Sequence, residues 1–421
     1  MQPDPVRRRL KEKQALRVES HLGVVVLGAG RSRAATWVVA GAVVVAVLGG
    51  CSGEASPDEA SAARAAAPSA AAQTPLAHVD VMPQNGAASA RPDKPIAVRV
   101  TDGTLTKVTV TSAAGAAVAG KLSADGLTWR STGQLVLGTK YTVTAVATNK
   151  DGRPATTSSA FSTLTPARTV YTTVTPSEGW TVGVGMPVIV DFSRPVEDRA
   201  AALKALTVTS SSQVDGGWRW FSSSQVQWRP KTYWPSGTRV TVKAALRNLE
   251  LSPGVWGKGT KTTTFQVGSA MINTVDTQKH TLTVRKDGKV IRVIPVTTGK
   301  NGYATRNGIK VIMSRETSRR MDAETTGIAK DDPEYYDVKV KYAMRLTHSG
   351  EFFHAAPWSV ASQGHANVSH GCTGMSTENA EWLFKNSKVG DVAIFTGSKR
   401  ALEWGNGYTA WDMSFDRWVS G

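Results

Sequence analysis

Two short stretches near the C-terminal end of this 421-residue chain decide its expected fold and chemistry. Residues 353–358 read Phe-His-Ala-Ala-Pro-Trp, and residues 369–376 read Ser-His-Gly-Cys-Thr-Gly-Met-Ser. A thiol attacks as a thiolate, so it needs a neighbouring base or positive charge. Two imidazoles are available to Cys372, one at His370, two residues before it, and one at His354, eighteen residues before it. The pattern therefore indicates a candidate cysteine nucleophile.

Two interpretations of Cys372 stay open on chemistry alone. It is either a small buried residue beside structural histidines or a nucleophile. Ser-His-Gly-Cys favours the nucleophile, because three of its four residue types are rarely core fillers. Glycine at position 371 lets a substrate carbonyl approach, and we expect free Gly371 and Cys372 amides to form an oxyanion hole. Ser369 is expected to hydrogen-bond locally, because a thiol is available beside it.

The order of residues along the chain restricts the class of cysteine enzyme. No histidine follows Cys372 in the sequence, so the arrangement of papain-like and NlpC/P60-like peptidases is impossible within this chain. The base must lie upstream. His348, in a Thr-His-Ser-Gly turn, and His365, in a polar run, are interpreted as loop residues. Because no His, Cys or Asp cluster has metal-ligand spacing, we expect neither a metal nor a cofactor.

A histidine followed about sixteen residues later by Ser-His-Gly-Cys resembles the signature of the L,D-transpeptidases with a YkuD-type catalytic domain. The resemblance to the actinobacterial and mycobacterial members covers about residues 75–421, and it includes the stretch 353–364. It implies that His354 is the base and that His370 supports and positions the loop. One position departs from the family, because Gly374 stands where asparagine is usual. Glycine there loses a local hydrogen bond and gains freedom to adopt a positive φ.

The polar segment at 314–342 corresponds, by the same resemblance, to a mobile lid over the acyl-donor site. Tyr336 and Met321 fall at matching positions, and the Tyr336 hydroxyl is a candidate third group of the oxyanion hole. The alternative is a merely flexible loop. The residues expected to contact substrate are Tyr336, Met321, Ser369, Trp358 and Gly374.

The resemblance implies a two-step acyl transfer on peptidoglycan stem peptides. The Cys372 thiolate attacks the L-centre carbonyl of diaminopimelate in a tetrapeptide stem, D-alanine leaves, and an acceptor amine resolves the thioester into a 3→3 cross-link. Carbapenem β-lactams are expected to acylate the same cysteine. Two alternatives stay open: an L,D-carboxypeptidase that gives the thioester to water, and a non-catalytic wall-binding lipoprotein.

Residues 1–51 predict an export signal that ends in a lipobox. An apolar run at 34–48, short for a membrane span, follows Arg31 and Arg33. Leu-Gly-Gly-Cys at 48–51 resembles a lipobox, in which Cys51 is lipidated; an uncleaved anchor with an incidental cysteine is the alternative. We therefore expect an exported protein at the outer face of the cytoplasmic membrane and cell wall, held by lipid at Cys51.

Charge and cysteine content agree with an exported cell-wall protein. The formal net charge of +17 suits an anionic surface such as a bacterial wall. No Lys/Arg cluster recurs with interleaved aromatic residues downstream of the signal, so nucleic acid is not an expected partner. With Cys51 lipidated, Cys372 has no disulfide partner, and a free thiol outside the cytoplasm favours a catalytic use.

Between the signal and the two motifs, the pattern predicts a tether and two β domains. Residues 52–75, rich in Ala, Ser and Pro, predict a flexible tether. Short β-branched runs between Gly and Asp-Gly turns predict two tandem immunoglobulin-like sandwiches at 76–165 and 166–268. Trp129 is expected to anchor the first core. We expect these domains to be spacers, with Trp218-Arg219-Trp220 as a candidate binding stretch or interdomain seam.

The predicted fold is thus mostly β, ending in a YkuD-type β-rich catalytic domain at 269–398 with one or two short helices. A hairpin is expected around Asp287-Gly288. The one clear helix is predicted over residues 377–386, with Ser376 as its N-cap. The tail at 399–421 carries four aromatics expected to pack on the catalytic or second sandwich domain, with ligand binding as the alternative: Trp404, Tyr408, Trp411 and Trp418.

Overall fold

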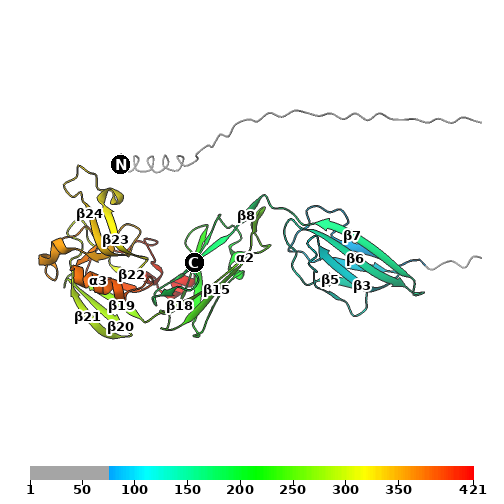
Figure 1. The fold of residues 1–421 in the computed structure, drawn as a ribbon, viewed down its shortest axis with the longest axis horizontal. Helices are drawn as coiled ribbons and strands as arrows, with labels where there is room; N and C mark the ends of the chain where they lie inside the picture. The colour runs from blue at the N-terminus through cyan, green and yellow to red at the C-terminus, as the bar shows by residue number, and fades with distance from the viewer. Residues whose placement is uncertain (1–74) are drawn as a thin grey trace, which may run out of the picture. The chain divides into compact units, whose positions relative to one another are not determined.

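The computed structural model describes residues 75–421, and strands dominate this part of the chain (Figure 1). The predicted export signal, the lipobox residue Cys51 and the tether as far as residue 74 lie outside the described residues. Within the described part, no helix is both long enough and apolar enough to cross a membrane.

The first described domain is a two-sheet sandwich, as predicted. One sheet has the order β1-β2-β5-β4 and the other β3-β6-β7. Trp129 is buried between them, which confirms it as a core residue, and Tyr141 stacks on Phe161 with ring centroids 5.6 Å apart. The strands are β1 (His78–Met82), β2 (Ala97–Thr101), β3 (Gly103–Ser112), β4 (Gly120–Leu122), β5 (Thr128–Ser131), β6 (Lys140–Asn149) and β7 (Pro154–Ser162).

A second sandwich follows, with four-stranded sheets β10-β18-β15-β12 and β13-β14-β11-β9 and a small sheet β16-β17-β8. Its core is built largely from valines that alternate with polar residues along the strands. Its elements are β8 (Arg168–Val170), β9 (Thr172–Thr175), β10 (Thr181–Val182), β11 (Val188–Phe192), α2 (Arg199–Lys204), β12 (Leu206–Ser210), β13 (Gly216–Trp220), β14 (Gln225–Pro230), β15 (Arg239–Ala245), β16 (Glu250–Ser252), β17 (Val255–Gly257) and β18 (Thr260–Val267).

The Trp-Arg-Trp stretch serves two neighbours at once. Trp218 and Trp220, expected to belong to a binding stretch or an interdomain seam, pack against the core of the second sandwich. Between them, Arg219 donates from Nη1 to the carbonyl oxygens of Arg417 and Trp418 in the tail, at 2.6 and 3.2 Å. The period of two in strand β13 separates these roles, because successive side chains point to opposite faces.

The C-terminal domain contains two sheets, in the orders β21-β20-β19-β27-β22 and β23-β24-β25-β26. Its core includes residues of both sheets and of helix α3. The elements are β19 (Met271–Asp276), β20 (Thr281–Lys286), β21 (Lys289–Pro295), β22 (Gly308–Val311), β23 (Ser314–Asp322), the 3₁₀ turn η1 (Ala323–Thr326), β24 (Asp337–Arg345), β25 (Phe352–Ala355), η2 (Pro357–Ser362), β26 (Thr373–Met375), α3 (Thr377–Asn386), β27 (Val392–Thr396), η3 (Ala410–Asp412) and α4 (Phe415–Val419).

The hairpin and the helix expected in this domain are confirmed. Asp287 and Gly288 both have positive φ, as a two-residue primed turn between β20 and β21 requires. Helix α3 has the predicted bounds, and the Ser376 Oγ accepts from the Asn379 amide at 3.2 Å as an N-cap.

The segment predicted as a polar lid at 314–342 is shorter than expected. Its two ends are paired antiparallel strands, β23 and β24, which pair from Ser314–Arg345 to Asp322–Asp337. The lid that the resemblance predicts can therefore comprise only residues 323–336. Its polar flanks concealed the strands, because much of β23 and β24 is only partly buried and carries charged side chains.

The tail packs on the second sandwich, as one of the two expected partners. The indole nitrogen of Trp411 donates to the Gly185 carbonyl at 2.6 Å, and that of Trp418 donates to the Gly217 carbonyl at 2.8 Å. Arg229, almost fully buried, lies against the rings of both tryptophans. The tail, which follows the C-terminal domain in sequence, thus joins that domain to the second sandwich through bonds that span 226 and 201 positions.

Candidate functional site

Parallel pairing of strands β25 and β26 brings the two motifs together. In this pairing His354 lies opposite Gly374 and Phe353 lies opposite Thr373. Cys372 immediately precedes β26, so it comes to the same region of the sheet as His354. Both residues line one pocket of about 380 Å³. The pocket also gathers the other residues expected at the site apart from Gly371: Met321, Tyr336, Trp358, Ser369, His370 and Gly374.

His354 is buried and oriented by its own strand. Its Nδ1 lies 2.8 Å from the Ala355 carbonyl oxygen. A carbonyl oxygen only accepts, so Nδ1 carries the proton in this contact and Nε2 is left as the basic nitrogen. Burial lowers the pKa of His354, so the imidazole is neutral at neutral pH. The ring is thus a proton acceptor rather than a cation.

Cys372 is held as a neutral thiol. Its Sγ donates to the Gly350 carbonyl oxygen at 3.5 Å. Burial is the main cause that raises the pKa of Cys372 to about 12; a hydrogen bond with the Phe352 backbone and the charge of Lys310 oppose the increase, and the Glu351 carboxylate adds to it. The isolated side chain is therefore not a thiolate at neutral pH, and it reacts only if a base takes its proton during attack.

The predicted oxyanion hole is only partly available. The Gly371 amide donates to Ser369 Oγ at 3.1 Å, so the expectation that this amide is free was wrong. Ser369 Oγ in turn donates to the Cys372 carbonyl at 2.6 Å, which confirms its local role. A serine two residues before the amide closes this turn. The φ of +123° at Gly371 lies in the region that favours glycine.

His370 connects the cysteine loop to the lid. Its Nε2 lies 2.7 Å from Glu334 Oε2, and the same oxygen accepts from Lys300 Nζ at 2.5 Å. The lysine and then the histidine lower the pKa of Glu334, so it is a carboxylate at neutral pH. The sequence alone did not indicate Glu334 and Lys300 as site residues, because they lie 34 positions apart and no local pattern connects them.

Two lid-side residues form part of the pocket wall. Tyr336 lies against His370 with ring centroids 4.9 Å apart, and Met321 is nearly fully buried. Burial raises the pKa of Tyr336, so its phenol stays protonated and can donate a hydrogen bond. On the open side, Trp358 is 61% exposed and stacks on His354 with centroids 6.1 Å apart.

Gly374 is required by space rather than by backbone conformation. Its φ lies outside the positive region, so the expected positive-φ freedom is not used. A Cβ at this position would come within 2.8 Å of Ala356 Cβ and 3.1 Å of Thr297 Cγ2. The backbone of Gly374 also exchanges two hydrogen bonds with Thr297, at 2.9 and 3.0 Å. The strand is therefore too closely packed for an unadjusted side chain.

Known proteins share the sequence of both the sandwich region and the C-terminal domain. Family models match the chain twice: "Bacterial Ig domain" over residues 87–250 and "L,D-transpeptidase catalytic domain" over residues 271–395. The chain is 37% identical to L,D-transpeptidase 2 of Mycobacterium tuberculosis, over 80% of this chain and 83% of the relative. It is 34% identical to L,D-transpeptidase 5 of the same species, over 82% of this chain and 77% of the relative.

Solved structures with sequence similarity belong to the same group. The LD transpeptidase LdtMt1 in complex with imipenem is 38% identical and covers 55% of this chain and all of that chain, with a TM-score of 0.48. L,D-transpeptidase 3 of M. tuberculosis with a faropenem-derived adduct is 33% identical and covers 53% of this chain and 97% of that chain, with a TM-score of 0.45. Immunoglobulin-like modules ahead of a domain with a histidine–cysteine pocket define a modular class of protein. The identity over most of the length of two relatives then makes the assignment specific: the chain belongs to the L,D-transpeptidase family.

Proposed function

We propose that this protein forms 3→3 peptidoglycan cross-links through a thioester on Cys372. The observation that carries the proposal is the parallel β25–β26 pairing, which places His354 and Cys372 in one pocket. Family membership supports the reaction class. The donor is a tetrapeptide stem, and the acceptor is the side-chain amine of a second stem.

In the first step, His354 takes the proton of Cys372 as sulfur bonds to the donor carbonyl. The basic nitrogen is Nε2, because Nδ1 is engaged with Ala355. The tetrahedral intermediate collapses with loss of D-alanine, and the imidazolium returns its proton to the leaving amine. The high pKa of the resting thiol is compatible with this route, because proton removal accompanies attack rather than preceding it.

In the second step, the acceptor amine attacks the thioester carbonyl. His354 takes the excess proton of the amine and returns it to the departing sulfur, so the free thiol is restored. Water in place of the amine would give an L,D-carboxypeptidase. Chromatographic analysis of cross-linked dimer against trimmed monomer, with purified stem peptides, separates the two outcomes.

The oxyanion is stabilised by the Cys372 amide, with the Tyr336 hydroxyl as a second donor. Tyr336 is neutral and lines the pocket. The Gly371 amide contributes only after it releases Ser369 Oγ. Preorganised donors of this kind are worth about 10²–10³ in rate each.

Acylation by imipenem tests the central claim, because a related enzyme has been solved in complex with that carbapenem. We expect the wild-type chain to gain the mass of one carbapenem at Cys372. Cys372→Ala should gain none, and His354→Ala should react about 10²–10⁴-fold more slowly, because the base is lost and the nucleophile stays. An adduct on Cys372→Ala at the wild-type rate would place the nucleophile elsewhere.

We further propose export and lipid attachment at Cys51, which rests on the lipobox-like residues 48–51. The acyl chain would hold the enzyme at the outer face of the cytoplasmic membrane, and the tether would give it reach into the wall. Cys51→Ala is expected to release the protein from the membrane fraction or leave it unprocessed. Unchanged fractionation together with an unchanged mature N-terminus would refute the lipid anchor.

A further inference from the structure

Two hydrogen bonds to backbone carbonyls join the loop that carries Cys372 to two neighbouring loops. The Gly350 carbonyl accepts the Cys372 thiol at 3.5 Å, and the Gly371 carbonyl accepts from Thr305 Oγ1 at 2.8 Å. Neither Gly350 nor Thr305 lines the pocket that holds His354. The placement of the sulfur therefore depends on two loops outside that pocket.

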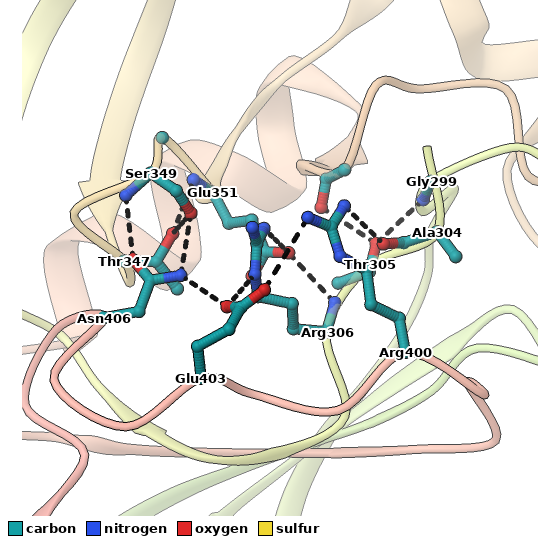
Figure 2. Close-up of polar contacts among 12 residues, drawn as sticks. Gly299, Ala304, Thr305, Arg306, Thr347, Ser349, Glu351, Arg400, Glu403 and Asn406 are labelled. Atoms are coloured by element: carbon teal, nitrogen blue, oxygen red, sulfur yellow. Dashed lines mark hydrogen bonds and ion pairs between the residues drawn. The ribbon is translucent and has the colours of Figure 1, made fainter. Parts of the chain in front are cut away.

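The first loop, residues 347–351, is held by the tail. Asn406 Oδ1 accepts from the Ser349 amide at 2.9 Å, and Asn406 Nδ2 donates to Ser349 Oγ at 2.9 Å (Figure 2). Ser349 directly precedes Gly350, so these two bonds restrain the turn that carries the carbonyl facing the thiol. Two bonds from one amide side chain restrict both position and orientation.

The second loop is held by the same part of the tail. Arg306 follows Thr305, and its Nε donates to Glu403 Oε2 while its Nη1 donates to Glu351 Oε1 at 3.1 Å (Figure 2). Glu403 Oε2 also accepts from Asn406 Nδ2 at 2.8 Å, so the two tail residues act as one unit. Although burial raises the pKa of Glu403, hydrogen bonds from Arg306 and Asn406 lower it to about 2, so the group is a carboxylate at neutral pH.

A buried ion pair makes the connection stiff. Lys310, fully buried, donates to Glu351 Oε2 at 2.6 Å, and the Arg306 amide donates to Glu351 Oε1 at 2.9 Å. Burying charges is costly unless each has its partners, so this cluster favours one arrangement over a range of positions. Arg306 bonds two carboxylates, those of Glu351 and Glu403, and Glu403 is the one that belongs to the tail.

We propose that Glu403 and Asn406 are positioning residues for Cys372. Through Ser349 they hold the loop whose Gly350 carbonyl accepts from the thiol, and through Arg306 they hold the loop whose Thr305 hydroxyl donates to the Gly371 carbonyl. This inference rests on the proposed function. It gives the C-terminal tail a role in the reaction besides joining two domains. Trp411 and Trp418 attach the same tail to the second sandwich, so that sandwich also helps to hold Glu403 and Asn406 in place.

The test separates placement of the thiol from binding at the pocket. On the full-length chain, imipenem acylation is followed by mass spectrometry, and the maximal acylation rate is resolved from the concentration giving half of it. For Glu403→Ala/Asn406→Ala, we expect the maximal rate to fall about ten- to a hundredfold, as displacement of a reacting group does. The half-saturating concentration should change little, because no tail residue lines the pocket.

Two single variants keep the test decisive. Glu403→Gln retains an oxygen that can accept from Arg306 and Asn406, so it should recover most of the wild-type rate. Asp416→Asn removes a carboxylate from the same tail at an exposed position and should behave as wild type. Should the double variant fail to fold by circular dichroism, Asn406→Ala alone is measured with the same two parameters.

An independent probe distinguishes failure of this inference from failure of the proposed function. Iodoacetamide alkylates Cys372 whatever the enzyme's reaction, and a thiol released from the Gly350 carbonyl should react about two- to tenfold faster. Unchanged acylation and alkylation in the folded double variant would overturn the positioning role. Parallel changes in maximal rate and half-saturation would also overturn it, because they indicate general damage. Absence of acylation in the wild type, with alkylation intact, would instead overturn the proposed function.

Discussion

At the scale of single residues, the site shows how a side chain's environment sets its chemistry. His354 and Cys372 are both neutral at rest, since burial lowers the pKa of the imidazole and raises that of the thiol. A preformed ion pair is therefore not the resting state. The proposed reaction therefore needs one proton to pass from the thiol to the imidazole as the bond to carbon forms.

Gly374 gives a prediction at this scale. In Gly374→Asn, the new Cβ must displace Ala356 or Thr297, and overpacking of this kind costs about 1–3 kcal/mol. We expect a lower free energy of unfolding, measured by denaturant titration, and slower imipenem acylation. Gly374→Ala should show a smaller loss, and Gly374→Ala/Ala356→Gly should regain stability. Wild-type stability and acylation in Gly374→Asn would show that the strand can separate at no cost.

At the scale of elements, the lid at 323–336 is joined to the cysteine loop by one carboxylate. Glu334 Oε2 lies 2.5 Å from Lys300 Nζ and 2.7 Å from His370 Nε2, and the Glu334 side chain is 37% exposed. Within the lid, Lys330 and Glu324 form a more exposed pair at 3.4 Å that does not reach the pocket. The two carboxylates therefore provide a matched comparison within one short segment.

We predict that Glu334→Ala loosens the lid. Loss of its two charged hydrogen bonds should speed amide hydrogen exchange in residues 327–336 by about two- to tenfold, because each bond contributes modestly at a partly exposed position. The donor concentration for half-maximal rate should rise. Glu324→Gln serves as the control and should leave both quantities unchanged. Equal exchange in Glu334→Ala and wild type would show that aromatic contacts alone hold the lid.

At the scale of the whole described chain, the second sandwich and the C-terminal domain meet backbone to backbone. The Gly183 amide donates to the Val389 carbonyl at 2.8 Å, and the Gly185 amide donates to the Gly390 carbonyl at 2.9 Å. A Cβ on Gly183 would collide with the backbone of Gly390 and Asp391. Asp391, fully buried at this contact, accepts from the Lys388 amide at 2.7 Å through one oxygen.

Asp391 predicts how stability varies with pH. Burial raises its pKa to about 7, so between about pH 4 and pH 7 the carboxyl is protonated in the folded chain and ionised in the unfolded chain. Folded stability should therefore fall as pH rises through that window and stay level above it, by at most about 4 kcal/mol. Denaturant unfolding of Asp391→Asn at pH 5 and pH 8 should show a smaller decrease than wild type. An identical decrease would assign the pH dependence to other groups.

Local sequence determined much of this protein. The turn at Asp287-Gly288, the Ser376 cap and the alternation around Trp129 act over a few residues, so their structures follow from neighbours in the chain. The histidine–cysteine spacing, read with the family resemblance, also identified the pocket residues. These features are short-range or motif-borne, which is why they were predictable.

Tertiary structure decided what depends on distant partners. Strands β23 and β24 form beneath polar side chains because they pair with each other, and Gly371 loses its free amide to Ser369 only in the folded turn. Glu334 meets His370, and Glu403 meets Arg306, across 36 and 97 positions of sequence. Charges this far apart carry no shared local pattern, and their pairing is set by how the sheets and the tail pack. The sequence thus determined which residues are reactive, while the packing decided which residues hold them in place.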